Sequence, residues 1–217
     1  MNYETLKAYQ REHRDNFHPN LALRSHRALS WLQRAEMEQD DQDAQFIFLW
    51  IAFNASYAVE IEHQPKERER DQFSAFFEKI CELDQEQKIY HQLWTVFSSQ
   101  IRALLNNKFV HQPFWDFQNG RIDEAEWSTR FKSAKQTAAI ALANQDTVTV
   151  LSIIFSRLYT LRNQLVHGGA TWNSGANRQQ IKECSAMLQT IVPLIIETMM
   201  QNPNTLWGDA YYPVIKE

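Results

Sequence analysis

The segment from Val148 to His167 restricts the fold of this chain more than any other part of the sequence. Its apolar residues recur at intervals of three and four, which is the spacing of one buried face of an α-helix. Gly168 follows directly, where a glycine ends a helix by adopting a left-handed backbone conformation. The pattern predicts a long core helix that ends at His167. The apolar positions are Val148, Leu151, Ile154, Phe155, Leu158, Leu161, Leu165 and Val166.

Several other segments have the same helical pattern and little that would interrupt it. With only five glycines and six prolines in 217 residues, the sequence lacks the turn residues that an all-β fold needs. The expected fold is therefore all-α, a single helical bundle of about seven helices that spans residues 1–217. The other predicted helices cover residues 21–38, 43–62, 71–81, 85–105, 124–144 and 178–201.

An aromatic-rich stretch over residues 106–122 interrupts the helical pattern. It contains Pro113 and the turn pair Asn119-Gly120, which predict an irregular insertion rather than a helix. We expect the side chains of Phe114, Trp115 and Phe117 to pin this insertion to the bundle. We also expect the tail with Trp207, Tyr211 and Tyr212 to pack back onto the helices.

Charge and motif content narrow the classes of function. The net charge of −4 excludes a basic surface overall, so that nucleic acid would have to bind a local patch. Cys81 and Cys184 are far apart and sit at apolar helical positions, which predicts core thiols. The histidines lack metal-ligand spacing and no glycine-rich phosphate loop occurs, so we expect neither a metal site nor a cofactor.

The same reading predicts a cytoplasmic protein that does not enter a membrane. The residues from Met1 to Asn20 are polar and do not form the apolar core of a secretion signal. The most apolar run, from Phe46 to Val59, is shorter than the roughly 20 residues of a membrane-spanning helix. We expect it to be a buried core helix instead.

The hexad Arg162-Asn163-Gln164-Leu165-Val166-His167, named the hexad below, holds the one concentrated set of candidate catalytic groups. A guanidinium offers a fixed fork of donors to phosphate oxygens, and an imidazole exchanges a proton near neutral pH. RNA supplies its own nucleophile, the 2′-hydroxyl, so an acid, a base and a charge stabiliser suffice for cleavage without metal. We expect Arg162 and His167 to be catalytic, with Asn163 binding the substrate or orienting His167.

The residues around the hexad favour a partner that carries phosphate. Between Asp146 and Glu183 the sequence contains no acidic residue, which predicts a local positive field. A tryptophan and small polar side chains follow the hexad, and single-stranded RNA sites use such groups for stacking and hydrogen bonding. The candidate RNA-binding residues are Arg157, Trp172, Asn173, Arg178 and Lys182.

A structural interpretation of the hexad remains open beside the catalytic one. Arg162 and His167 point about 140° apart on an ideal helix and need not touch. Arg162 then pairs with an acidic residue of a neighbouring helix, and His167 caps the free carbonyls at the helix end. A further alternative is a module that binds RNA or protein without catalysing a reaction.

The stretch Leu161-Arg162-Asn163-Gln164-Leu165-Val166-His167-Gly168 resembles the Arg-x4-His signature of the HEPN superfamily. The run Phe48-Leu49-Trp50-Ile51-Ala52-Phe53-Asn54-Ala55 is similar to the apolar helix that precedes this signature in Apea-like and related HEPN proteins. The resemblance covers residues 43–62 and 148–201. Gly169 stands where some toxin members of the superfamily have a tyrosine, so regulation through that tyrosine is not expected.

The resemblance implies an HEPN-like bundle that forms a homodimer around a two-fold axis. Two Arg-x4-His motifs would then face each other and form one composite, metal-independent ribonuclease site. In this reading Arg162 stabilises the phosphate in the transition state, His167 is the general acid or base, and Asn163 supports both. Asn54 would be a supporting contact behind them. The resemblance also implies a toxin or defence role, with a neutralising antitoxin as a second partner.

Overall fold

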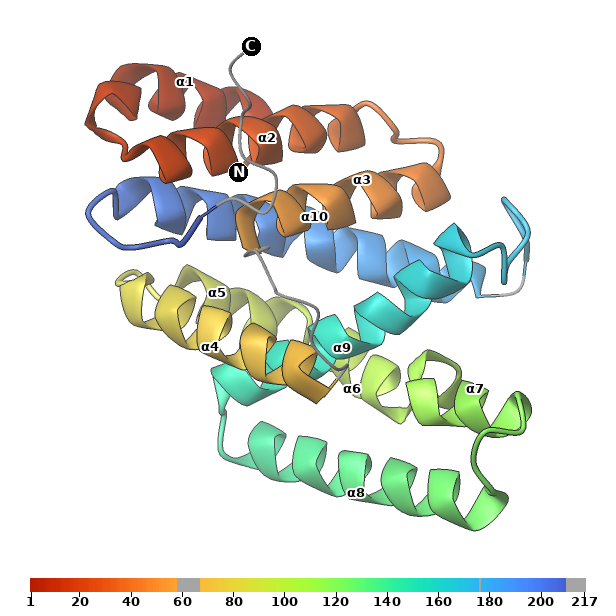
Figure 1. Cartoon of the computed structure of the whole chain (residues 1–217). Helices are drawn as coiled ribbons and strands as arrows, with labels where there is room; N and C mark the ends of the chain where they lie inside the picture. The colour runs from red at the N-terminus through yellow and green to blue at the C-terminus, as the bar shows by residue number, and fades with distance from the viewer. Residues whose placement is uncertain (58–66, 176, 210–217) are drawn as a thin grey trace.

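The computed structural model describes residues 1–57, 67–175 and 177–209, and its regular structure is helical throughout these ranges (Figure 1). The prediction of an all-α fold is therefore confirmed. Short turns, η1 (Arg14–Asn16), η2 (Gln92–Val96) and η3 (Lys108–Val110), connect some of the helices. The α-helices are α1 (Tyr3–His13), α2 (Pro19–Glu36), α3 (Gln42–Tyr57), α4 (Glu67–Leu83), α5 (Lys88–His91), α6 (Ser98–Asn106), α7 (Gln112–Gln118), α8 (Glu124–Ala143), α9 (Thr147–Val166) and α10 (Arg178–Gln201).

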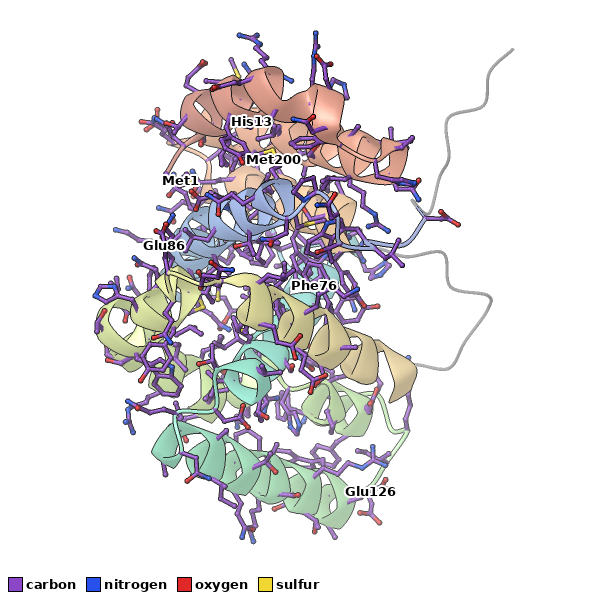
Figure 2. The ribbon with its side chains drawn as sticks, turned by 90° about the vertical axis from the view of Figure 1, so that its left-hand side faces the viewer. Met1, His13, Phe76, Glu86, Glu126 and Met200 are labelled. Carbon is purple, nitrogen blue, oxygen red and sulfur yellow. The ribbon has the colours of Figure 1, made fainter. Side chains whose placement is uncertain are left out.

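The helices stack in layers (Figure 1). Helices α1 and α2 form one end, α3 and α10 lie beneath them, and α4, α5, α6 and α9 follow. Helix α8 forms the opposite end and packs against α7, and in the side view of Figure 2 His13 of α1 lies toward one end and Glu126 of α8 toward the other. Helix α10 extends without interruption through Pro193 and has the bounds that the sequence predicted.

The described part of the chain has more helices than the sequence predicted, partly because α1 was missed. Helix α1 is mostly polar, with only Leu6 and Gln10 buried, so its sequence carries a weak helical signal. Its start is capped by Asn2, whose Oδ1 accepts a hydrogen bond from the Thr5 amide at 3.1 Å. Local capping rather than an apolar face therefore defines this helix.

The expected helix over residues 85–105 is divided into α5, the π-helical turn η2 and α6. The Phe97 amide bonds the Gln92 carbonyl at 3.0 Å, five residues back, and the backbone of Phe97 leaves the helical region. The apolar residues on both sides of the break, such as Leu93 and Ile101, are nevertheless buried. Because the apolar pattern continues across the break, periodicity alone could not reveal it.

The expected irregular insertion contains the helix α7, which corrects that prediction. Pro113 lies in the first turn of α7, a position where its missing N–H group has no helical partner to lose. The buried ring of Phe114 packs against Trp127 of α8, with ring centroids 5.3 Å apart. The aromatic residues of this segment therefore join α7 to α8.

Several helices begin at residues other than the predicted ones. Helix α2 begins at Pro19 after the N-cap His18, two residues before the predicted start at residue 21. Helix α4 begins at Glu67, four residues before the predicted start at residue 71. The last five residues of the predicted helix 43–62 lie outside the described residues, as do Tyr211 and Tyr212.

An aromatic cluster forms the centre of the core, where α3, α4 and α9 meet. The ring centroids of the fully buried Phe53 and Phe155 are 4.4 Å apart, and those of Phe77 and Phe155 are 4.8 Å apart. Ring contacts of this kind add to the free energy gained from burying the rings.

Cys184 is also buried. Its burial and, to a smaller extent, the charge of Glu183 raise the pKa of its thiol to about 12.

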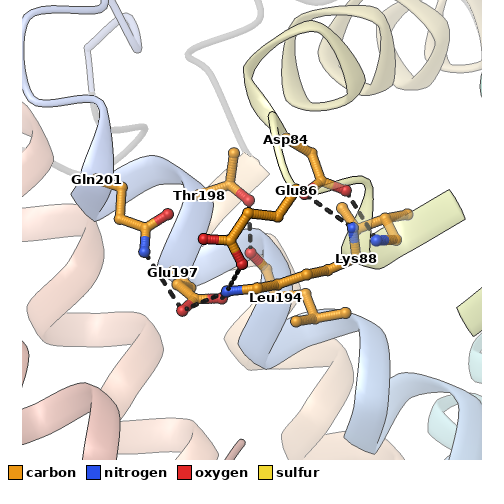
Figure 3. A network of polar contacts seen from close by, with 8 residues as sticks. Asp84, Glu86, Lys88, Leu194, Glu197, Thr198 and Gln201 are labelled. Atoms are coloured by element: carbon orange, nitrogen blue, oxygen red, sulfur yellow. Dashed lines mark hydrogen bonds and ion pairs between the residues drawn. The ribbon is translucent and has the colours of Figure 1, made fainter. Parts of the chain in front are cut away.

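A polar network ties the corner between α4 and α5 to α10 (Figure 3). Asp84 caps α5 by accepting hydrogen bonds from the amides of Lys88 and Ile89 at 3.1 and 2.8 Å. The Lys88 ammonium lies 3.1 Å from Glu86 and 3.1 Å from Glu197 of α10.

Among the described helices, none is both long and apolar enough to cross a membrane.

Candidate functional site

The hexad forms the last turn and a half of α9, and local hydrogen bonds define where that helix ends. The Gly168 backbone has a φ of 70°. Its amide bonds the Leu165 carbonyl at 3.3 Å, and the Gly169 amide bonds the Gln164 carbonyl at 2.7 Å. This pair of bonds is the Schellman motif, and it confirms the prediction that Gly168 terminates the helix.

The ring of His167 is exposed beyond this helix end. The carbonyls of Asn163, Gln164 and Leu165 already accept backbone hydrogen bonds, so the imidazole is not needed to cap them. Within the described residues, no hydrogen bond joins the His167 ring to another group. The imidazole is therefore accessible for proton transfer from solvent or a bound ligand.

Arg162 is held by its own neighbour rather than by an acidic residue. Its Nη1 donates a hydrogen bond to Oδ1 of Asn163 at 2.9 Å. In the part of the chain that the structure describes, no carboxylate lies within ion-pair distance of this guanidinium. Asn163 thus binds Arg162, not His167, and leaves the positive charge of Arg162 unneutralised. The structural interpretation, which needs an acidic partner for Arg162, gains no support here.

One chain does not bring Arg162 and His167 together. Arg162 lies within α9, whereas His167 is its C-cap with φ −92° and ψ 12°, and on an ideal helix the two side chains would point about 140° apart. No hydrogen bond between them is present among the described residues. Within one chain, the two groups therefore do not form a joined pair.

The segment after the hexad is anchored to the start of α3. Asp43, which is buried, accepts hydrogen bonds from the Asn173 amide at 2.9 Å and from Nη2 of Arg178 at 2.7 Å. Asp41 accepts a hydrogen bond from Nε1 of Trp172 at 2.8 Å. The amide of Ala44 and then the Trp172 indole lower the pKa of Asp41, although its partial burial opposes this. Both carboxylates hold the segment in place.

These contacts change the electrostatic expectation for the site. The interval around the hexad is free of acidic residues in sequence, yet Asp41, which precedes α3, and Asp43, in the first turn of α3, both bond to residues within it. Arg178 is therefore neutralised by Asp43 and serves to position the segment. Trp172 remains 70% exposed and Lys182 is also exposed, so both stay accessible to a ligand.

Arg157 does not lie at the surface, contrary to the expectation that it binds RNA. It is only 4% exposed and lies in the interior near His111. Burial, together with the charges of Arg157 and Arg130, lowers the pKa of His111 to about 3. Arg157 lies on the same face of α9 as the buried residues Ile153, Ile154 and Leu161.

Asn54 does not approach Arg162 either. The ring centroids of Trp50 and Tyr159 are 6.1 Å apart, and those of Phe53 and Phe155 are 4.4 Å apart. The earlier residue of α3 thus pairs with the later residue of α9, so the two helices run in opposite directions where they cross. Asn54 is therefore level with Phe155, which precedes Arg162 by about 10 Å along the helix. The expected supporting contact between Asn54 and the catalytic groups is absent from this arrangement.

The structure adds neighbours to the hexad that sequence reasoning missed. Nε2 of Gln164 donates to the Phe109 carbonyl at 2.6 Å, and Trp115 donates to the same carbonyl at 2.7 Å. Phe109 is 43% exposed, and the Lys108 ammonium lies 5.3 Å from its ring centre. An exposed aromatic ring with a cation beside it therefore adjoins the hexad. The aromatic composition of residues 106–122 was the only available signal.

Comparison of the chain with protein-family models, curated proteins and solved structures found no match in any of the three. The likeness to the HEPN superfamily therefore depends on the hexad and on the α3 segment alone.

No group of three His, Cys, Asp or Glu side chains in the described ranges is arranged to hold a metal ion.

Proposed function

We propose that this protein is a metal-independent RNA endonuclease of HEPN type. The observation that carries the proposal is the state of Arg162. Its guanidinium is oriented by Asn163 at 2.9 Å and has no carboxylate partner among the described residues, on the same helix end that exposes His167. An oriented, unneutralised cation and an accessible imidazole on one helix end suit a phosphodiester substrate.

The proposed reaction is attack of the RNA 2′-hydroxyl on the adjacent phosphorus. One His167 imidazole accepts the proton of the 2′-hydroxyl while the new oxygen–phosphorus bond forms. Arg162 binds the phosphate oxygens and stabilises the added negative charge. The bond to the 5′-oxygen breaks, and that oxygen takes a proton from an imidazolium. The products are a 2′,3′-cyclic phosphate and a 5′-hydroxyl.

The proposal includes a homodimer, because one chain separates Arg162 from His167. Two copies related by a two-fold axis would place the His167 of one copy opposite the Arg162 of the other, and two imidazoles would supply both the base and the acid. Exposed apolar side chains support an association near the hexad. Val166 is 49% exposed within the hexad itself, and Trp172 follows it in sequence.

The test is incubation of the protein with RNA in EDTA, together with a measurement of its mass in solution. We expect cleavage by the wild-type protein, a dimeric mass, and a loss of at least about a hundredfold in Arg162→Ala and His167→Ala. Arg11→Ala and His26→Ala, which alter exposed residues on α1 and α2, are the matched controls and should retain full activity.

The outcomes separate the proposed nuclease from the non-catalytic alternative. Cleavage that persists in both hexad variants, or that EDTA abolishes, contradicts the proposal. RNA binding without any cleavage by the wild type favours an RNA-binding module with the same bundle.

A further inference from the structure

A groove of about 390 Å³ lies between α6 and α8, and no hexad residue lines it. Basic and amide side chains stand at its edges, and small or apolar side chains form its floor. Arg102, Asn106 and Lys135 are the polar groups and are exposed, whereas the buried Leu105 and Ala138 and the half-buried Leu142 form the floor. Ala139 also lines the groove and is exposed, so this side of α8 is open to a ligand.

The surroundings of the groove are unusually poor in acidic residues. The sequence contains no Asp or Glu over residues 87–115, which include α6, or over residues 127–145, which include most of α8. In the described part of the chain, neither Arg102 nor Lys135 has a carboxylate within ion-pair distance. Among the described residues, the two cations of the groove are therefore not neutralised by ion pairs, and they remain available to an anionic ligand.

Lys132 is a further cation on α8. On an ideal helix it points within about 20° of Ala139, an exposed residue that lines the groove. Lys132, Lys135 and Ala139 therefore lie along the same exposed side of the helix. Cations beside an apolar floor suit a chain of phosphates whose bases contact the floor.

The groove leads toward the hexad. The chain leaves α6 at Asn106 and reaches Phe109 three residues later, a path of at most about 11 Å. The Phe109 carbonyl accepts the hydrogen bond from Gln164 of the hexad. The exposed Phe109 ring, with Lys108 beside it, provides a surface on which a base can stack between the groove and Arg162.

We propose that the groove between α6 and α8 binds the phosphate backbone of single-stranded RNA and directs it past Phe109 to the hexad. The identity of the polyanion as RNA rests on the proposed function. The groove contributes affinity for the substrate, whereas the hexad carries out the chemistry. The two sets of residues do not overlap, so substitutions can separate their roles.

The test is fluorescence anisotropy with a labelled single-stranded 2′-O-methyl oligonucleotide, which lacks the nucleophile and cannot be cleaved. The double variant R102Q/K135Q removes two positive charges from the groove. The control S133E/T137E changes the net charge by the same amount on the outer, exposed face of α8. Thermal unfolding checks that both variants keep the wild-type fold.

The proposal requires R102Q/K135Q to weaken binding by roughly 25-fold at 0.1 M salt and to lower the salt slope by about 1.4, the loss of two phosphate contacts. S133E/T137E should change affinity by less than about threefold. Equal affinity of both double variants overturns the groove proposal, as does a wild type that does not bind the oligonucleotide.

Cleavage assays distinguish this proposal from the proposed nuclease activity. If R102Q/K135Q binds the oligonucleotide more weakly than the wild type but neither protein cleaves RNA, the groove proposal is supported and the nuclease proposal is contradicted. If the wild type cleaves RNA and R102Q/K135Q binds as tightly as the wild type, only the groove proposal falls. If R102Q/K135Q is monomeric where the wild type is dimeric, the groove is an interface between copies and the proposal is overturned.

Discussion

Gln164 in the hexad and Phe109 in η3 are joined by a hydrogen bond of 2.6 Å from a side-chain amide to a main-chain carbonyl. This bond attaches the segment before α7 to the end of α9, although 55 positions separate the two residues. Because Trp115 donates to the same carbonyl, the Phe109 backbone is held from two sides. The position of the exposed Phe109 ring relative to Arg162 depends on this attachment.

Gln164→Ala should loosen η3 without unfolding the protein. The Phe109 carbonyl keeps its bond from Trp115, so we expect a loss of about 1 kcal/mol in the free energy of unfolding. If Phe109 stacks on substrate, KM for RNA should rise severalfold while kcat stays nearly constant. Urea unfolding and steady-state cleavage measure the two effects. Gln189→Ala, at an exposed position of α10, should change neither, and an equal loss of stability in both variants would contradict this role of Gln164.

Substitutions of Asn163 test whether Arg162 must remain unneutralised. Asn163→Ala removes the 2.9 Å hydrogen bond that orients the guanidinium, and we expect single-turnover cleavage to fall about tenfold. Asn163→Asp keeps the position of the acceptor but adds a negative charge, so its cleavage rate should fall further than that of the alanine variant. Faster cleavage by Asn163→Asp than by Asn163→Ala would show that the charge of Arg162 is not used on phosphate.

Asp43 should stabilise the segment after the hexad. Asp43→Ala leaves the Arg178 guanidinium and the Asn173 amide without their buried acceptor. Because the Arg178 side chain is 27% exposed, the pair is only partly buried, and we expect the free energy of unfolding to fall by about 2 kcal/mol. Asp40→Ala changes an exposed aspartate three positions away and is the matched control. Equal midpoints of urea unfolding for both variants would refute this role.

His111 should make the stability of the protein depend on pH between about 3 and 6.5. Burial, then Arg157 and Arg130, lower the pKa of this histidine to about 3, whereas its unfolded value is 6.5. The unfolded state thus binds the proton first, so the free energy of unfolding should decrease as the pH falls below 6.5. In His111→Leu this contribution should vanish, and the stability curve should be flatter over that range. His26→Leu, at an exposed position, should leave the slope unchanged; a wild-type slope in His111→Leu would disprove the assignment.

Lys88 should stabilise the packing of the corner between α4 and α5 against α10 (Figure 3). Desolvation lowers the pKa of Lys88, but hydrogen bonds and charges from Glu86 and Glu197 outweigh it and raise the pKa overall. The stabilising contribution is therefore complete below pH 10.5 and is lost only above it. Lys88→Met should lower the free energy of unfolding by about 1–2 kcal/mol at pH 8. Lys182→Met, at an exposed position of α10, serves as the control in the same urea titration.

The amino-acid sequence alone determined the helices whose ends have strong local signals. Asp146 and Gly168 bound α9 through capping bonds to nearby amides and carbonyls, and both bounds were predictable because these interactions span only a few residues. The short helices α1 and α7 were not predicted, because α1 is mostly polar and α7 has only seven residues, with a proline in its first turn.

Only the tertiary structure decided what surrounds the hexad. Helix α3 brings Asp43 to Arg178, and η3 brings Phe109 to Gln164, over sequence separations of 135 and 55 positions. Packing also buried Arg157 in the core, although it lies five positions from Arg162 on the same helix. A local positive charge in the sequence therefore did not define a positive surface, because long-range packing determines which charges meet and which remain exposed.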